Sequence, residues 1–380
     1  MEIAPLCLVR SRGVTLFLCG DVMTGRGVDQ ILPHPSNPVL HEPCVQSAVE
    51  YLAMAEAAHG PIPKPAAFSY IWGDALEEVE RAAPDARIVN LETSITTSDG
   101  YESKGINYRM HPANFPCLAA AKIDCCVLAN NHVLDWGRGG LADTLCILRK
   151  ANIQTAGAGR DLQEAWAPAV INLGGRSRLL VFAAGTMDSG IEPHWGATAS
   201  APGVVLLRDL SEKTAELIAE RVAGVKRPGD IALFSIHWGG NWGYDIPRHH
   251  EAFARRLIDR AGIDAVHGHS SHHPKGIEIY KQKLILYGCG DFLNDYEGIA
   301  GYEAFRSHLV LAYCATLDSE TGKLLRLEIA PFEIRRFRLQ HATAQDAAWL
   351  RDMLNREARP LGTHADLDAR NRLVLSWRRS

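Results

Sequence analysis

Four histidines stand within seven residues of one another in the segment VHGHSSHHPKGIEIY, residues 266–280. They are His267, His269, His272 and His273. Neutral imidazole is a common metal ligand, and histidine also transfers protons near neutral pH. Histidines three residues apart, in a glycine-led loop that follows an apolar run, rarely serve a packed core. The segment therefore predicts a metal-binding or proton-transfer site.

Polar side chains also follow short apolar runs elsewhere in the chain. They are Asp21 after LFLCG, Asn90 and Glu92 after RIV, Asn130, Asn131 and His132 after CCVLA, His237 after IALFSI, and His269 after DAVHG. In an open α/β sheet, ligands bind outside the carboxyl ends of the strands, so these side chains can converge. Carboxylate, amide and imidazole donors suit Mn, Zn, Fe or Mg rather than a structural zinc. A glutamate can bridge two ions, which indicates a two-metal site.

Each of these motifs also has a purely structural explanation. An aspartate after a strand is often a turn or N-cap residue. The NNH triplet at 130–132 could be a surface turn, and HWGGNWG around His237 could be a glycine-rich loop with aromatic packing. Chance would seldom place all of them at predicted strand ends, so together they favour a functional site.

The elements that must position these residues are short aliphatic runs, each ended by a polar or glycine cluster, as is typical of buried strands. The runs are VTLFLCGD, ARIVNLET, IDCCVLANNH, DIALFSIHWGG, IDAVHGHS and LILYGCGDF. Helical patterns are clearest over residues 140–150, 211–225 and 247–261. The alternation of strand and helix predicts an α/β sheet covered on both faces.

The chain reads as one domain over residues 1–380, with a core at about 14–300, because it shows no internal repeat or linker. A proline-rich stretch with a helical pattern interrupts the core at about 33–65. We interpret it as an insertion over the sheet edge, either near the site or as a decorative loop. The last part, about 305–380, predicts a second antiparallel layer from HLVLAYCATL and LLRLEIAPFEIRRFRL, and then a helix with Thr343 as N-cap.

Composition excludes several classes of protein. Apolar residues make up 47% of the chain and charged residues 22%, as in ordinary globular proteins. A net charge of −4 with scattered basic residues argues against a nucleic-acid partner. Nine cysteines without a CxxC motif predict reduced thiols. The apolar run at 14–19 is too short for a secretion signal or a membrane span, so we expect a cytoplasmic protein without a membrane anchor.

Five longer motifs occur between residue 16 and about residue 296. They are CGDVMTGRG, NLETSIT, LANNHVLDWG, SIHWGGNWGYDIP and HGHSSHHPKGIEIYKQKLILYGCGDF. Their sequence and order resemble the CapA family of capsule or poly-γ-glutamate synthesis proteins, which is itself similar to the calcineurin-like metallophosphoesterases. The resemblance implies an α/β protein with the calcineurin-like metallo-dependent phosphatase fold, a four-layer α/β/β/α sandwich.

The resemblance also implies a set of metal ligands. They are Asp21, Glu92, Asn131, His237, His269 and His272. Glu92 would bridge two ions, with Asp21 and His272 on the first ion and the other three residues on the second. His132 matches a histidine that acts as acid or base. The cofactor would be one or two divalent ions, with Mn, Zn, Fe, Mg and Ca all open.

The chain departs from the family patterns at several places. Metallophosphoesterases usually carry Asp-x-His in the first motif, whereas this chain has DVM at 21–23, so one ligand is absent. This weakens the case for two-metal phosphoester hydrolysis. The bridging residue is Glu92 rather than an aspartate, as is usual for CapA. GDF at 290–292 replaces Gly-Asn-Phe and makes Asp291 a candidate catalytic base or ligand.

Substrate contacts are predicted at three further residues. Arg109, in GINYRMHP, resembles a family arginine that faces the site and could hold a substrate carboxylate. Trp238, with Trp242 and Tyr244, could wall an apolar pocket or belong to the core. His273 is expected at the rim of the cleft, where it would meet a substrate anion or water.

Three functions compete at this point. The favoured hypothesis is a CapA-like metal-dependent enzyme that acts on a peptide or poly-γ-glutamate-like substrate, with His132 or Asp291 as the base. Its reaction would be epimerisation at Cα or amide hydrolysis. The alternatives are a metallophosphoesterase, which rests on analogy of fold, and a non-catalytic assembly factor that binds a polymer end. The sequence does not determine the oligomeric state.

Overall fold

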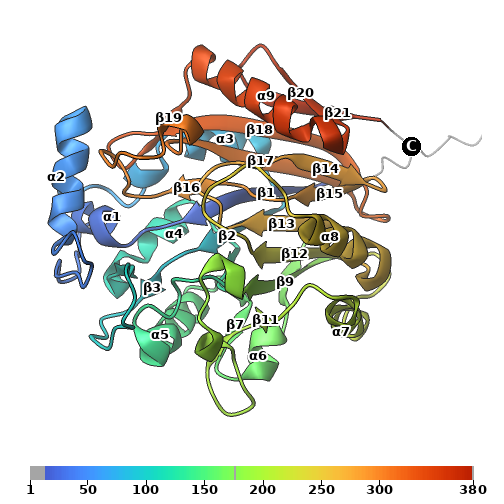
Figure 1. The fold of residues 1–380 in the computed structure, drawn as a ribbon, viewed down its shortest axis with the longest axis horizontal. Coiled ribbons are helices and arrows are strands. Elements are labelled where there is room, and N and C mark those ends of the chain that lie inside the picture. The colour runs from blue at the N-terminus through green and yellow to red at the C-terminus, as the bar shows by residue number, and fades with distance from the viewer. Residues whose placement is uncertain (1–12, 175–176, 379–380) are drawn as a thin grey trace, which may run out of the picture.

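The computed structural model describes residues 13–174 and 177–378 (Figure 1). Within these ranges most strands join two large sheets, one of ten strands and one of seven. The first has the order β20-β21-β18-β17-β1-β2-β5-β6, with β16 beside β1 and β19 beside β18. The second has the order β11-β9-β12-β13-β15-β14, with β8 beside β9.

The elements have the following bounds. The first sheet contains β1 (Gly13–Val22), β2 (Ala86–Leu91), β5 (Cys125–Val127), β6 (Gln154–Ala156), β16 (Asp291–Leu293), β17 (Leu309–Asp318), β18 (Leu324–Ile334), β19 (Leu339–His341), β20 (Thr363–Leu367) and β21 (Leu373–Trp377). The second contains β8 (Ala169–Asn172), β9 (Arg178–Thr186), β11 (Leu206–Leu207), β12 (Ile231–His237), β13 (Ala265–His269), β14 (Ile277–Tyr280) and β15 (Lys283–Leu286). Two short pairs join β3 (Ser94–Ile95) to β4 (Arg109–Met110) and β7 (Ala158–Gly159) to β10 (Gly203–Val204). The helices are α1 (Arg26–Ile31), α2 (Ala48–His59), α3 (Ala75–Ala82), α4 (Pro116–Ala120), α5 (Gly137–Lys150), α6 (Leu162–Trp166), α7 (Glu212–Ala223), α8 (Arg248–Ala261) and α9 (Ala344–Ala358).

The two sheets lie face to face with helices outside them (Figure 1). Successive strand residues point to opposite faces. In β12, Ile231 and Leu233 belong to the core shared with the first sheet, whereas Phe234 and Ile236 belong to a second core shared with α7 and α8. This alternation explains why the strand reads as one continuous apolar run. The four-layer α/β/β/α sandwich implied by the sequence is confirmed, and the single sheet first expected from the strand–helix alternation is corrected to two.

The C-terminal strands do not form a layer of their own, so that prediction was wrong. β17 pairs antiparallel with β1 from Gly13↔Asp318 to Cys19↔Ala312, and β18 pairs with β17. Both therefore extend the first sheet. The helix predicted after them is confirmed as α9, and the Thr343 side chain accepts a hydrogen bond from the backbone N–H of Asp346.

The run LILYGCGDF, expected to be one strand, is divided between the two sheets. β15 ends at Leu286 in the second sheet, and β16 begins at Asp291 beside β1 in the first. Gly290, with φ +80°, lies in the left-handed region that favours glycine and allows the chain to turn between them. The crossing brings Asp291 into register with Asp21.

Gly20 directly precedes Asp21 and lies where β1 approaches β16. A Cβ added there would stand 1.6 Å from the carbonyl oxygen of Gly290, so an alanine must push two backbones apart. We expect Gly20→Ala to lower the free energy of unfolding by about 1–3 kcal/mol or more in urea denaturation. Gly224→Ala is the matched control, because its nearest atoms would be 3.5 Å away. Equal losses in both variants would contradict this view of the strand crossing.

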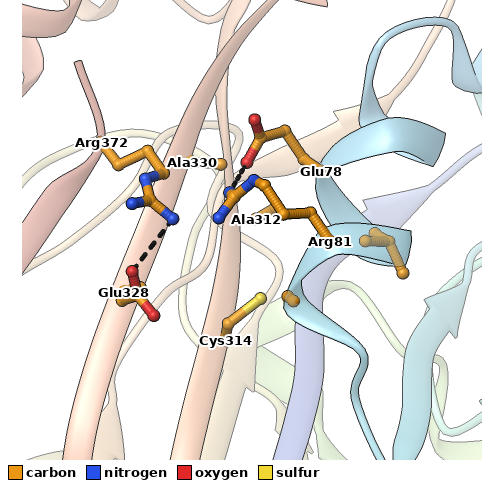
Figure 2. A pocket seen from close by; sticks show the side chains of 9 residues that line it. Glu78, Arg81, Ala312, Cys314, Glu328, Ala330 and Arg372 are labelled. Carbon is orange, nitrogen blue, oxygen red and sulfur yellow. Dashed lines mark hydrogen bonds and ion pairs between the residues drawn. The ribbon is translucent and has the colours of Figure 1, made fainter. Parts of the chain in front are cut away.

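A small niche lies between α3 and strands β17 and β18 (Figure 2). Its volume of about 20 Å³ suits a single water molecule. Its charged side chains pair with each other, Arg372 with Glu328 at 3.1 Å and Arg81 with Glu78. Burial, together with the nearby carboxylate of Glu328, raises the pKa of the Cys314 thiol to about 12, so it is not a reactive thiolate. The niche is a packing feature.

No helix in the described ranges has both the length and the apolar character needed to span a membrane.

Candidate metal centre

The predicted ligands lie at the carboxyl ends of parallel strands in both sheets. β1, β2 and β5 run parallel, and so do β9, β12 and β13. Asp21 near the end of β1 is in register with Asn90 of β2, whose side-chain amide donates to it at 2.7 Å. His237 and His269 are register partners at the ends of β12 and β13. Strand pairing within the first sheet therefore fixes Asp21 relative to Asn90, and pairing within the second fixes His237 relative to His269.

The edges of the two sheets meet at this cluster. His269 Nδ1 lies 3.8 Å from Asp21 Oδ1, and His237 Nε2 lies 3.7 Å from Glu92 Oε1. Asn131 Oδ1 is 3.0 Å from His237 Nε2. All of these contacts join one sheet to the other. The structure thus brings together five of the six side chains that the family resemblance implied as ligands.

The sixth, His272, lies in the loop after β13 and is held by a carboxylate. Its Nδ1 is 2.8 Å from Asp291 Oδ1, and the Asn294 amide donates to Asp291 Oδ2 at 2.7 Å. Burial lowers the pKa of His272, but the charge and hydrogen bond of Asp291 and the charge of Asp21 together outweigh burial, so the pKa is raised. Asp291, the residue that departs from the family motif, therefore positions His272.

His269 is oriented by a chain of hydrogen bonds beneath the cluster. The Ser235 hydroxyl is 2.8 Å from His269 Nε2 and 3.0 Å from His267 Nδ1, and His267 Nε2 is 2.7 Å from the carbonyl oxygen of Cys19. Because Nε2 of His269 is engaged, its Nδ1 faces the cluster, 2.7 Å from His237 Nδ1 and 3.8 Å from Asp21 Oδ1. Outer partners of this kind fix ring orientation in metal sites. His267 itself is buried on β13.

The electrostatics of the cluster favour a bound cation. Burial raises the pKa of Asp21 to about 7, with the nearby Asp291 charge adding to the effect and the Asn90 amide opposing it. Burial, with the charges of Asp21 and Asp291, also raises the pKa of Glu92 well above its usual range. Burial lowers the pKa of His237, with neighbouring imidazoles adding to the effect. Crowded carboxylates and neutral imidazoles are the forms that a divalent ion stabilises.

The residues present fit a divalent metal ion. Their donors are carboxylate, amide and imidazole groups, the set preferred by Mn, Zn and Fe. One ligand atom each from Asp21, His237 and His269 lie within 4.8 Å of one another, and all three side chains are buried. Within the described residues, the buried Oε2 atom of Glu92 has no hydrogen-bond donor. A buried carboxylate oxygen without a donor is costly unless a cation compensates it.

His132 stands beside the cluster and is held by a carboxylate that the sequence analysis missed. Its Nδ1 lies 2.7 Å from Asp135 Oδ2, and its Nε2 lies 4.0 Å from Glu92 Oε1. Burial lowers the pKa of His132 to about 4, although Asp135 opposes this shift. Asp135 also accepts the Tyr108 N–H at 2.6 Å and the Lys104 ammonium at 2.8 Å. The HVLD spacing, which puts an aspartate three residues after the histidine, was the available signal.

Two of the predicted substrate contacts are already engaged by other parts of the protein. Arg109 donates to the Ser98 carbonyl at 2.8 Å, pairs with Asp99 at 3.1 Å and stacks on Trp136 at 3.8 Å, so its guanidinium is already engaged. Trp238 is 3% exposed, donates to the Tyr287 carbonyl at 2.9 Å and packs in the second core. Neither side chain borders the cavity described below, and both predictions are corrected on this ground.

His273 is the third correction. It was expected at the cleft rim, but it is fully buried, with its ring stacked on Phe305 at 4.6 Å and packed edge-on against Tyr244 at 4.6 Å. Burial lowers its pKa to about 4, so it is a neutral packing residue at physiological pH. Its apolar neighbours could not be read from the local sequence.

A cavity of about 470 Å³ opens beside His272. It is lined by Arg26, Tyr51, Ile106, Asn241, Trp242, His272, Tyr296, Ile299, Tyr302, Glu303, Arg306, Ser307 and His308. Tyr51 belongs to α2, so the insertion contributes one wall; α1 and α2 lie together at one side of the molecule (Figure 1). A space of this size is within the roughly 300–1,000 Å³ typical of small-molecule sites.

The comparisons with known proteins agree with this geometry. A family model described as "Bacterial capsule synthesis protein PGA_cap" matches residues 15–296. The chain belongs to this family. It carries the calcineurin-like metallophosphatase fold of the CapA proteins, which confirms the family and the fold class indicated by the sequence motifs.

Two relatives of this PGA_cap family member are named for polyglutamine or PGA synthesis. A protein of Mycobacterium tuberculosis described as a probable polyglutamine synthesis accessory protein is 48% identical, over 92% of both chains. A protein of Bacillus subtilis described as "PGA biosynthesis protein CapA" is 27% identical, over 64% of this chain and 60% of its own. A solved structure described as a novel phosphatase from Mycoplasma pneumoniae covers 84% of this chain and 93% of its own, at 11% identity and a TM-score of 0.46, and we draw nothing from so low a likeness.

The contact between Asp291 and His272 leads to a prediction about metal affinity. We expect Asp291→Ala to weaken divalent-metal binding by about 10–100-fold, the usual effect of removing a carboxylate that orients a histidine ligand. Isothermal titration of the metal-free protein with Mn²⁺ measures this. Asp291→Asn keeps an acceptor oxygen for His272 and should stay close to the wild type. Equal loss in both variants would indicate that the negative charge, rather than the orientation of His272, matters.

Proposed function

We propose that this PGA_cap family member is a metal-dependent enzyme that performs acid–base chemistry at a carbonyl group of a peptide-like substrate. The observation that carries the proposal is the pairing of His132 with Asp135 at 2.7 Å beside a buried cluster of metal-type donors. An assembly factor that only binds a polymer has no need of an oriented imidazole at that place. The relatives named for polyglutamine and PGA synthesis support an amide-linked substrate.

Asp21, Glu92, Asn131, His237, His269 and His272 would hold the metal. A bound divalent ion would polarise a carbonyl or carboxylate oxygen of the substrate. Asp291 keeps His272 in place, and Ser235 does the same for His269.

His132 moves the proton in this scheme. Asp135 is an acceptor for the Nδ1 hydrogen, which leaves the lone pair on Nε2, on the side that faces Glu92. A neutral imidazole with a free Nε2 can remove a proton from Cα or from a water molecule. Lys104 and the Tyr108 N–H both donate to Asp135 and hold its carboxylate in place.

The first experiment incubates the Mn²⁺-loaded protein with a panel of γ- and α-linked peptides in deuterated water. Mass spectrometry then distinguishes the two possible reactions. Deuterium at Cα without new termini indicates epimerisation, whereas new termini indicate hydrolysis. Neither signal with any peptide, while the metal remains bound, would overturn the proposal and favour the assembly-factor hypothesis.

Metallophosphoesterase activity is the second candidate, favoured by the ligand set at the ends of both sheets. Met23 argues against it, because this buried thioether stands where the phosphoesterase motif has a histidine and contacts only the Tyr296 hydroxyl, at 3.7 Å, among the described polar groups. We expect at most weak hydrolysis of bis-p-nitrophenyl phosphate with Mn²⁺. Fast turnover that Asn131→Ala abolishes would reverse this ranking.

A further inference from the structure

We propose that the cavity beside His272 is a subsite for an uncharged aromatic side chain of the peptide, next to the bond or carbon that reacts. The inference rests on the proposed function and narrows its substrate class. Trp242 and Tyr302, which have no role in the metal centre, would then select the peptide side chain that enters the cavity. A substrate consisting only of glutamyl units would then be a poor one.

Aromatic rings surround His272 on the cavity side. The centroid of the Trp242 ring lies 5.3 Å from that of the His272 ring. The centroid of the Tyr296 ring lies 5.4 Å from it, and the Tyr296 ring is perpendicular to the His272 ring. The backbone N–H of His272 donates to the Asn241 carbonyl at 2.9 Å, which fixes the residue directly before Trp242. The wall that begins at the metal centre is therefore aromatic and held in place.

The stack continues to the mouth of the cavity. Tyr302 lies parallel to Trp242, with 3.9 Å between ring centroids and 5° between planes. Tyr302 is 50% exposed, and the neighbouring wall residues Ile299 and Ile106 are 49% and 40% exposed. Large apolar groups left exposed around a cavity mark a binding surface. A planar ring entering here would extend the stack and cover these side chains.

The charges in the wall do not suit a chain of carboxylates. Arg26 is bound to Asp295 through two hydrogen bonds and to Glu42 at 2.9 Å, and all three residues are buried. Arg306 pairs with Asp346 at 2.8 Å. In the described part of the wall, both arginines are thus neutralised by carboxylates. A glutamate side chain would lose water without gaining a free cation.

The ring faces near Arg26 offer little to a cationic side chain. The Arg26 guanidinium already lies 3.8 Å over the Tyr51 ring and 4.6 Å over Tyr108, so it occupies the ring faces that would attract a cation. An uncharged aromatic group is the class that gains most from the stacked rings.

The test measures binding, so it does not depend on turnover. Three acetylated, amidated peptides Gly-X-Gly, with X as Phe, Glu or Lys, are titrated into the Mn²⁺-loaded protein and followed by NMR of the peptide. We expect the Phe peptide to bind about tenfold more tightly than the other two, the scale of an aromatic contact in a confined site. Trp242→Ala and Tyr302→Ala should each reduce this preference several-fold, and Trp242→Phe should restore most of it. Trp377→Ala, outside the cavity, should keep it.

Equal or tighter binding of the Glu or Lys peptide overturns the subsite, and so does failure of all three peptides to bind. A Phe preference that survives in both Trp242→Ala and Tyr302→Ala also overturns it. Tyr302 lies in an exposed loop, so its variant remains informative if Trp242→Ala does not fold. A Phe preference without any turnover supports the subsite and rejects the enzyme, whereas turnover of Glu peptides alone supports the enzyme and rejects the subsite.

Discussion

The His237→Ala variant is expected to lose its divalent metal. His237 is the residue that joins the two halves of the centre, since it contacts Asn131 at 3.0 Å and Glu92 at 3.7 Å across the sheets, and His269 at 2.7 Å beside it. Outer-shell partners alone cost about 10–100-fold in metal affinity, so the loss of this side chain should cost more than about 100-fold. Metal content after gel filtration, measured by inductively coupled plasma mass spectrometry, gives the result.

A stability measurement checks the same prediction independently. A metal that binds only the folded state at 100 times its Kd raises the free energy of unfolding by about 2.7 kcal/mol. We expect Mn²⁺ to stabilise the wild type in this way and His237→Ala hardly at all. His364→Ala is the control, because its side chain is 60% exposed on β20 and pairs only with Asp366 among the described residues. Normal metal content in His237→Ala would contradict the ligand assignment.

The sequence predicted the elements of the fold better than their connections. Strands and helices could be located because apolar runs and their polar ends are local features. The allocation of β17 to the first sheet depends on pairing between Gly13 and Asp318, far apart in the chain, and so it was missed. β9 was not among the predicted strands, although it lies beside β12 in the second sheet and contains the apolar run LLVFAA. Its alternate residues face two different cores.

The convergence of the candidate metal ligands could be predicted from sequence for a physical reason. Its donors stand at strand ends, and the strand end is visible in the sequence as the point where an apolar run stops. Side chains that act from loops gave no such signal. Arg109 and His273 looked like free polar groups, but Asp99 and Phe305 engage them in the fold. Conversely, Lys104 reaches Asp135 from a loop whose sequence shows no periodicity.

The location of the cavity explains why the insertion and two later loops matter together. Tyr51 from the insertion, and Trp242 and Tyr302 from two later loops, line the same space beside His272. Most of the candidate metal ligands stand at or just after strand ends and are set by strand register, whereas the cavity wall comes from α1, α2 and several loops. A site divided in this way can keep its chemistry while its loops change the substrate.

Replacing His132 with glutamine should separate chemistry from metal binding. Removing a positioned acid–base group typically costs 10²–10⁴-fold in rate, so we expect kcat to fall by about that factor in the peptide assay. Metal content should remain that of the wild type, because His132 Nε2 is 4.0 Å from Glu92 and the cluster holds its donors without it. His341→Gln, at the exposed end of β19, is the matched control.

The two measurements together decide the role of His132. A slow variant that keeps its metal means that the imidazole moves a proton, as its Asp135-bound geometry indicates. A variant that loses both metal and activity would make His132 a structural support of the centre. An unchanged rate would remove it from the mechanism altogether, and the base would then have to be a group on another element. Asp135→Asn tests the first outcome further, because it keeps the shape of the His132–Asp135 pair but removes the carboxylate that accepts the Nδ1 hydrogen. We expect this variant to react more slowly and to keep its metal.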